Sequence, residues 1–148
     1  MNIRTLIVTA ILAGSCIGSA SADTFALTPG QYETRVAPFE GKGKPDVDSD
    51  CITADDAKDI VAYFKQQGSE DSCKLTDSKL TGKHFSGTSI CKGGPDKPFT
   101  TLNVKSELTF SADGYGGLLS EDGVGTDGKP FTKKLKVSAK RSGECKAS

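Results

Sequence analysis

Several residue types on which binding and catalysis often depend are rare or missing in this sequence of 148 residues. It has no Trp, its one Met is the initiator, and its one His is His84. Trp-lined sugar platforms and Met-rich adaptable surfaces are therefore excluded. Lys83 and Phe85, the neighbours of His84, supply no base or nucleophile pattern, and no G-x-S-x-G occurs. We therefore expect no catalytic residue and no enzyme.

Metal and phosphate motifs occur only as fragments. The segment 46–50 carries carboxylates at the first three oxygen positions of an EF-hand loop, but Cys51 and Ala57 stand where that loop needs Gly and Glu. Residues 123–128 match G-x-G-x-x-G by letter, yet a strand and not a helix is expected to follow them. The cysteines contain no C-x-x-C, which disfavours zinc binding and a thioredoxin-like role. We expect no metal and no cofactor.

A secretory leader is expected over residues 1–22. It contains Arg4, an apolar run from Leu6 to Ala13, and a small-residue cleavage site that ends at Ala22 and leaves Asp23 first. The apolar run is shorter than the roughly 20 residues that cross a bilayer, and no later stretch approaches that length. We therefore expect no membrane span.

Lipidation at Cys16 is the alternative fate of the leader. A lipobox has its Leu three residues before the Cys, whereas Leu12 lies four residues before it, which disfavours this alternative. Residues 23–148 are then expected to form one soluble, monomeric domain in the periplasm or outside the cell. Without Arg4 the domain has 18 basic and 19 acidic residues. A formal charge of −1 creates no global field for nucleic acid or anionic lipid.

Four cysteines, Cys51, Cys73, Cys91 and Cys145, remain after cleavage, which suits disulfides in an oxidising compartment. Residues at equal distances from a hairpin turn face each other, and Cys73 and Cys91 are each nine positions from Gly82. These two are expected to bond, which leaves Cys51 for Cys145. The alternative pairs Cys51 with Cys73 and requires a hairpin shifted off Gly82.

Alternation of apolar and polar residues predicts strands. They are expected over Gln31–Val36, Cys73–Leu80, His84–Cys91, Leu102–Phe110, Tyr115–Ser120 and Phe131–Lys140. The segment 38–50 has almost no apolar residue and predicts a long polar loop, while 121–130 predicts a turn-rich connection. The basic residues 133–141 are split between the two faces of the last strand, which favours a solvated face over a binding stripe.

One helix is expected between Thr53 and Gly68. Thr53 and the acidic residue three positions later form a capping-box variant, and Gly68 is the expected C-cap. Its apolar stripe consists of Ala57, Ile60, Val61 and Phe64. The fold class is therefore α+β and sheet-dominated: an antiparallel meander with one amphipathic helix on one face, stapled by two disulfides. The pattern leaves open whether the sheet closes partly into a barrel.

These landmarks together resemble a bacterial periplasmic family known as domain of unknown function 3617. The resemblance spans nearly the whole mature chain and rests on Pro29-Gly30-Gln31-Tyr32-Glu33, Cys51-Ile52-Thr53 with Asp56-Ala57, Cys73, Leu80-x-Gly82, Cys91 and Ala139-Lys140-Arg141-x-Gly143-x-Cys145. Tyr32 stands where that family often has Trp. The resemblance implies an exported domain and brings no activity, substrate or site residue.

Three classes of function remain after these observations. The leading hypothesis is a non-catalytic periplasmic binding or interaction module for a small apolar ligand or an envelope protein, because catalytic constellations are missing and sheets often carry binding sites. A small periplasmic enzyme of unknown reaction is the second. A structural or stress-protective envelope protein with a filled core is the third. The ligand-binding residues cannot be assigned from the sequence.

Overall fold

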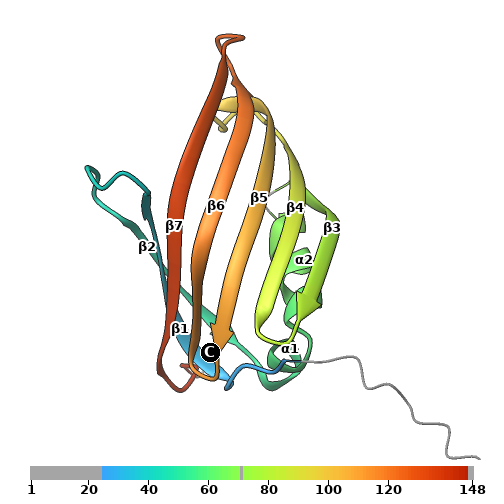
Figure 1. The fold of residues 1–148 in the computed structure, drawn as a ribbon, viewed down its shortest axis with the longest axis vertical. Coiled ribbons are helices and arrows are strands. Elements are labelled where there is room, and N and C mark those ends of the chain that lie inside the picture. The colour runs from blue at the N-terminus through green and yellow to red at the C-terminus, as the bar shows by residue number, and fades with distance from the viewer. Residues whose placement is uncertain (1–24, 71, 147–148) are drawn as a thin grey trace, which may run out of the picture.

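Seven strands and two short helices make up the fold (Figure 1). The computed structural model describes residues 25–70 and 72–146. The expected leader, Cys16 and the Ala22–Asp23 cleavage site lie outside the described residues. In chain order the elements are β1 (Gly30–Pro38), β2 (Asp46–Ile52), α1 (Ala54–Lys58), α2 (Ile60–Glu70), β3 (Cys73–Thr81), β4 (His84–Lys92), β5 (Phe99–Ser111), β6 (Gly114–Gly125) and β7 (Pro130–Gly143).

All strands belong to one antiparallel sheet with the order β2-β1-β7-β6-β5-β4-β3. The last five strands along the chain form a meander, and β1 then joins β7, so the first strand lies beside the last. β2 and β3 are the two edges, and the sheet is not closed. The predicted α+β, sheet-dominated class and the antiparallel meander are confirmed.

The sheet has an inner face, against which α2 packs, and an outer face. Strand alternation assigns side chains to the two faces. Phe85, Leu108 and Val137 are buried in the core on the inner face, whereas their chain neighbours His84 and Glu107 are exposed on the outer face. Figure 1 is viewed from the outer side, with α2 behind the sheet.

The expected single helix is wrong, because the chain forms two helices separated at Asp59. The capping box of α1 is present: Thr53 Oγ1 accepts from the Asp56 backbone N–H, and the Asp56 carboxylate accepts from the Thr53 N–H. Asp59 has non-helical φ and ψ of −132° and 78°. Its Oδ1 accepts from the Ala62 N–H at 3.0 Å, so it caps α2. Gly68 lies inside α2, and its predicted role as C-cap is also wrong.

Two predicted connections are partly strand. Residues 46–52 form β2, although 46–50 were expected to belong to the loop 38–50, and β6 continues to Gly125 into the expected turn region 121–130. β2 is an edge strand with one buried residue, Ile52, so backbone pairing with β1 holds it without an apolar pattern. β6 is central, and pairing with β5 and β7 on both sides compensates for its low strand propensity.

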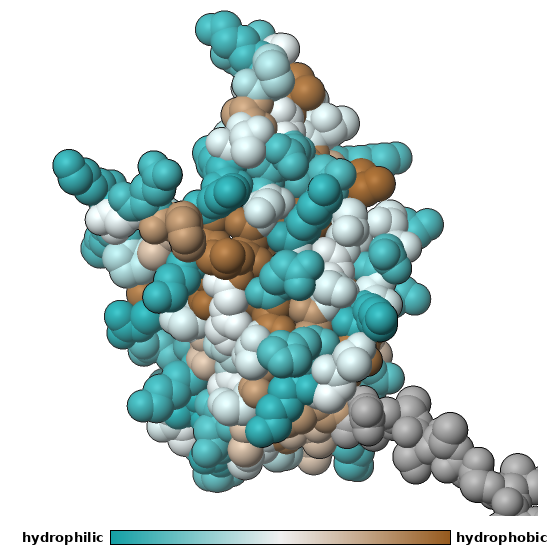
Figure 2. Space-filling view, in the orientation of Figure 1, coloured by the Kyte–Doolittle hydropathy of each residue, from teal (hydrophilic) through white to brown (hydrophobic). Residues whose placement is uncertain are grey.

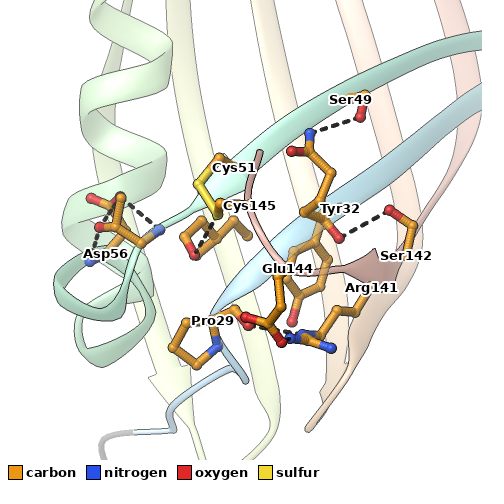
Figure 3. Close-up of a disulfide and its surroundings, with 12 residues drawn as sticks. Pro29, Tyr32, Ser49, Cys51, Asp56, Arg141, Ser142, Glu144 and Cys145 are labelled. Atoms are coloured by element: carbon orange, nitrogen blue, oxygen red, sulfur yellow. Dashed lines mark hydrogen bonds and ion pairs between the residues drawn. A yellow bond between two sulfur atoms is a disulfide. The ribbon is translucent and has the colours of Figure 1, made fainter. Parts of the chain in front are cut away.

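Two disulfides link the chain, Cys73–Cys91 and Cys51–Cys145, and these are the pairs favoured by the hairpin argument and by elimination. Cys73 and Cys91 are direct register partners of β3 and β4. Cys51, on β2, bonds Cys145, which follows β7, over a sequence separation of 94 (Figure 3). The Cys51–Cys145 bond therefore joins the segment after β7 to the edge strand β2.

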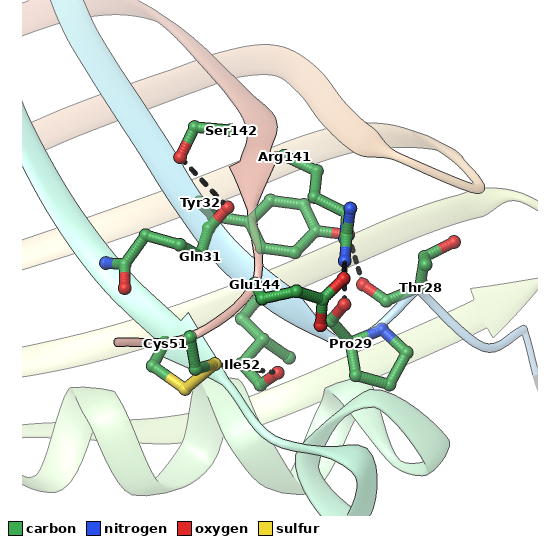
Figure 4. Close-up of polar contacts among 10 residues, drawn as sticks. Thr28, Pro29, Gln31, Tyr32, Cys51, Ile52, Arg141, Ser142 and Glu144 are labelled. Atoms are coloured by element: carbon green, nitrogen blue, oxygen red, sulfur yellow. Dashed lines mark hydrogen bonds and ion pairs between the residues drawn. A yellow bond between two sulfur atoms is a disulfide. The ribbon is translucent and has the colours of Figure 1, made fainter. Parts of the chain in front are cut away.

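Polar contacts hold together the end of the inner face beside the Cys51–Cys145 bond (Figure 4). We call this end, which includes Tyr32, Ile52 and Arg141, the closed end. The Tyr32 hydroxyl donates to the Thr28 carbonyl at 2.7 Å, and Arg141 Nε donates to the Pro29 carbonyl at 2.8 Å. Gly30 has a φ of 153°, and a Cβ there would lie 2.5 Å from Arg141 Nε, so glycine is required. Tyr32 is 1% exposed, so its side chain is fully buried at the closed end.

Candidate functional site

Phe64 on α2 is the centre of an aromatic cluster above the inner face. Its ring centroid lies 5.5 Å from those of Phe85 and Tyr115 and 6.1 Å from that of Phe110. The rings come from α2, β4, β5 and β6, so the cluster fixes the helix against the middle of the sheet. Aromatic pairs at such distances add to the free energy of burial by about 0.5–1.5 kcal/mol each.

A cavity of about 210 Å³ lies beside this cluster, between α2 and the sheet. Its lining is mostly apolar and comes from α2 and from all five strands of the meander. The lining residues are Phe64, Leu75, Phe85, Ser89, Ser106, Leu108, Tyr115, Leu119 and Val137. A concave, largely apolar site with a few polar groups is the usual form of a small-molecule site.

Small residues lie on the inner face at and beside the cavity. Gly87 on β4 is the register partner of Ser106 on β5, and Ser89 is the next inner-face residue on β4. Gly117 on β6 faces Leu108 across the next pair of strands. A Cβ on Gly87 would lie 2.8 Å from the Phe85 ring, so even alanine would force this ring to move. The Phe85 ring and Leu75 therefore lie over Gly87. Of the small residues, only Ser89 and Ser106 line the cavity directly.

Three hydroxyl groups supply the polar part of the cavity. No hydrogen bond joins the Ser89 or Ser106 hydroxyl to another group within the part of the chain that the structure describes. Both are therefore available to a ligand. The third hydroxyl belongs to Tyr115 and is hydrogen-bonded to Thr34 on β1. Burial raises the pKa of Tyr115, the hydrogen bond lowers it in part, and the charge of Asp50 raises it further, so Tyr115 is a neutral donor at physiological pH.

Carboxylates lie near the cavity without lining it. Asp50 on β2 has a raised pKa, because burial disfavours its charge and Asp48 and Glu70 repel it. Glu121 on β6, two residues beyond Leu119 on the inner face, also has a raised pKa owing to burial, which its register partner Lys133 offsets in part. Partial burial thus raises the pKa values of two carboxylates on the inner face.

The cavity is suited to binding, because its lining offers shape and hydrogen-bonding hydroxyls. Of its nine lining residues only Tyr115 can titrate. Within residues 25–70 and 72–146, no group of three or more His, Cys, Asp or Glu is placed to hold a metal ion. No helix in the same ranges is long and apolar enough to cross a membrane.

The residues weighed in the sequence do not meet at this cavity. His84 is exposed on the outer face, with Nδ1 3.2 Å from Thr109 Oγ1. The carboxylates of residues 46–50 lie along the extended strand β2 and do not converge as in a calcium loop. Residues 123–128 run from β6 into a turn, and β7 follows. The basic segment 133–141 is divided between the inner and outer faces of β7.

The sequence held a signal for the cavity that pattern reading missed. Many inner-face positions of β4, β5 and β6 hold large apolar residues, such as Phe85, Leu108 and Tyr115, and Gly or Ser interrupts each strand. The interruptions gain meaning only when the register places Gly87 opposite Ser106. In the sequence of one strand alone, such a Gly or Ser only weakens the strand prediction at that position.

Comparisons with known proteins identify the family and bring no activity. A family model described as Protein of unknown function (DUF3617) matches residues 27–145. No curated protein matches the chain, and no solved structure matches it.

Proposed function

The chain belongs to the DUF3617 family of proteins of unknown function, and on this premise we propose that it is an exported, non-catalytic binding module for a small apolar ligand. The observation that carries the proposal is the cavity of about 210 Å³ between α2 and the inner face of the sheet. Cavities of about 150 Å³ with apolar walls take up benzene. The ligand is therefore of the size of one aromatic ring or a short alkyl chain.

The chemistry of the lining supports binding over catalysis. The rings of Phe64, Phe85 and Tyr115 offer faces and edges to an apolar guest. The hydroxyls of Ser89 and Ser106 can orient one polar substituent of that guest. A general acid–base mechanism would need a group that titrates near neutral pH, and the raised pKa of Tyr115 places its hydroxyl far from that range.

The disulfides support the exported part of the proposal, because such bonds persist in oxidising compartments. Mass spectrometry of the protein from a periplasmic extract tests it. We expect a chain that begins at Asp23 and carries four fewer hydrogens than its reduced form, as two disulfides require. A chain that retains the leader in a reduced cytosolic fraction would contradict export.

An NMR titration with toluene tests the binding part. We expect saturable shifts of the amides of Gly87, Ser89 and Ser106 in the wild-type protein. Ser106→Phe, which fills the cavity, should weaken toluene binding about tenfold or more, because the guest loses the volume it occupies. Ser106→Leu is the milder filling variant, for use if Ser106→Phe does not fold.

Ser138→Phe is the matched control, since Ser138 is exposed on the outer face of β7. It adds the same ring without touching the cavity and should bind toluene like the wild type. Shifts spread over the outer face, or equal binding by the Ser106 and Ser138 variants, would refute the proposed cavity function.

A further inference from the structure

The two faces of the sheet carry opposite charge, although the whole chain is formally neutral. By register, the outer face holds eight basic and four acidic side chains. The basic ones are Arg35, Lys74, Lys79, Lys92, Lys105, Lys134, Lys136 and Lys140, and the acidic ones are Glu33, Asp77, Glu107 and Asp122. The outer face therefore has a formal charge of +4.

The inner face has the reverse balance. Its strands carry four acidic side chains, Asp46, Asp48, Asp50 and Glu121, against Lys133 and Arg141. Arg141 is already engaged by Glu144 and by the Pro29 carbonyl. A net charge computed from the sequence hides this separation, because strand alternation sends neighbouring residues to opposite faces.

The exposed large apolar side chains lie on the same basic face. Those of the described chain are Phe39, Val47, Ile90 and Leu118, which are 41–52% exposed. Val47, Ile90 and Leu118 occupy outer-face register positions, and Phe39 follows the inner-face residue Pro38 at the end of β1. Figure 2, viewed from this side, shows apolar atoms gathered left of centre and ringed by hydrophilic ones.

Lysines flank the apolar side chains directly. Leu118 is the register partner of Lys136, and the Phe39 N–H donates to the Lys134 carbonyl at 2.9 Å. Neither lysine forms an ion pair with any residue in the described ranges. An open groove of about 590 Å³ lies beside them, lined by residues 38–40 and 132–135. Cations without partners and exposed apolar groups thus share one patch, formed by Phe39, Leu118, Lys134 and Lys136.

We propose that the outer face binds peripherally to an anionic lipid bilayer through this patch. Lys134 and Lys136 would lie near lipid phosphates, with their alkyl stems along the surface and their ammonium groups in the headgroup layer. Phe39 and Leu118 enter the boundary between headgroups and acyl chains, where apolar side chains gain by burial. The charge of the face complements such a membrane, and the apolar groups distinguish it from a merely solvated basic surface.

Co-sedimentation of the disulfide-bonded protein with vesicles tests the proposal. We expect binding to vesicles of 30% phosphatidylglycerol in phosphatidylcholine, little binding to pure phosphatidylcholine, and weakening with added salt. Lys134→Glu/Lys136→Glu should lower the partition coefficient about tenfold or more, since each lysine near an anionic surface contributes about fivefold. Phe39→Ser/Leu118→Ser should lower it about fivefold or more.

Lys58→Glu/Lys65→Glu on the helices is the matched control, because it changes the net charge equally at exposed residues away from the outer face. It should retain the binding of the wild type. Equal losses in both lysine variants would show that only net charge matters and would overturn the proposal. Absence of binding to anionic vesicles would also overturn it and would favour an acidic protein as the occupant, and equal binding to neutral vesicles would overturn the role of the lysines.

Discussion

The closed end and the cavity lie on the same inner face, yet side chains are tightly packed at the closed end and leave empty space at the cavity. At the closed end Tyr32 and Ile52 are each 1% exposed, and polar groups such as Thr28 and Arg141 are paired. At the cavity, the small side chains of Ser89 and Ser106 border the empty space. The difference indicates that the strands nearest the two ends of the chain provide stability, which allows the central strands to keep a vacancy for a guest.

Removal of each disulfide is the strongest way to break this comparison. Cys51→Ser/Cys145→Ser should cost about 4.5 kcal/mol of unfolding free energy, because the bond closes a separation of 94 residues. Cys73→Ser/Cys91→Ser should cost about 3 kcal/mol, because the bond that it removes closes a separation of only 18 residues. Urea unfolding of both variants measures the difference. A larger loss from the hairpin bond would contradict the assignment of stability to the closed end.

Truncation of one apolar side chain at the closed end and one at the cavity gives a smaller and more local comparison. Ile52→Ala should cost about 3 kcal/mol, because a solid core leaves a new hole where the side chain was. Leu75→Ala should cost about 1.5 kcal/mol, since Leu75 already borders empty space. Thermal and urea unfolding of the two variants give the values. Similar losses at both positions would show that the cavity is collapsed in solution.

The smallest expected effect concerns the carboxylates near the cavity. A pKa raised in the folded state means that the charged form of Glu121 lowers stability above that pKa. Glu121→Gln should therefore be more stable than the wild type at pH 7, and the advantage should vanish as the pH falls to about 4, the ordinary pKa of Glu. Thermal unfolding between pH 3.5 and 7 follows the change.

Asp96→Asn at an exposed loop position is the control and should change the melting temperature little across this pH range. A Glu121→Gln protein that is less stable than the wild type at pH 7 would contradict the expected sign. It would mean that attraction to Lys133 outweighs the cost of burial.

Local patterns in the sequence predicted much of this fold. The hairpin centred on Gly82 set the register that places Cys73 opposite Cys91, and the capping box at Thr53 marked the start of α1. These features depend on residues close in the chain, so a short window contains their cause. The break at Asp59 also lies within a short window. In the sequence, however, Asp59 looks like one more polar residue of a continuous helix, and its capping hydrogen bond to the Ala62 N–H is not visible there.

The missed features depend on how the strands pair with one another. β2 carries no apolar alternation because it is an exposed edge, and only its pairing with β1 identifies it. The cavity needs the register between Gly87 and Ser106, and the charge of the outer face needs all seven strands in order. Tertiary pairing, rather than local propensity, decides each of these properties.

A crystal structure of the protein under xenon pressure would show where the inner face holds an apolar cavity, because xenon enters such cavities. We predict one xenon site among Phe64, Phe85 and Ser106 and none around Tyr32 and Ile52 at the closed end. A Phe64 ring that fills the cavity without xenon, or xenon bound at both ends alike, would contradict the division of the inner face into a solid end and a vacant one.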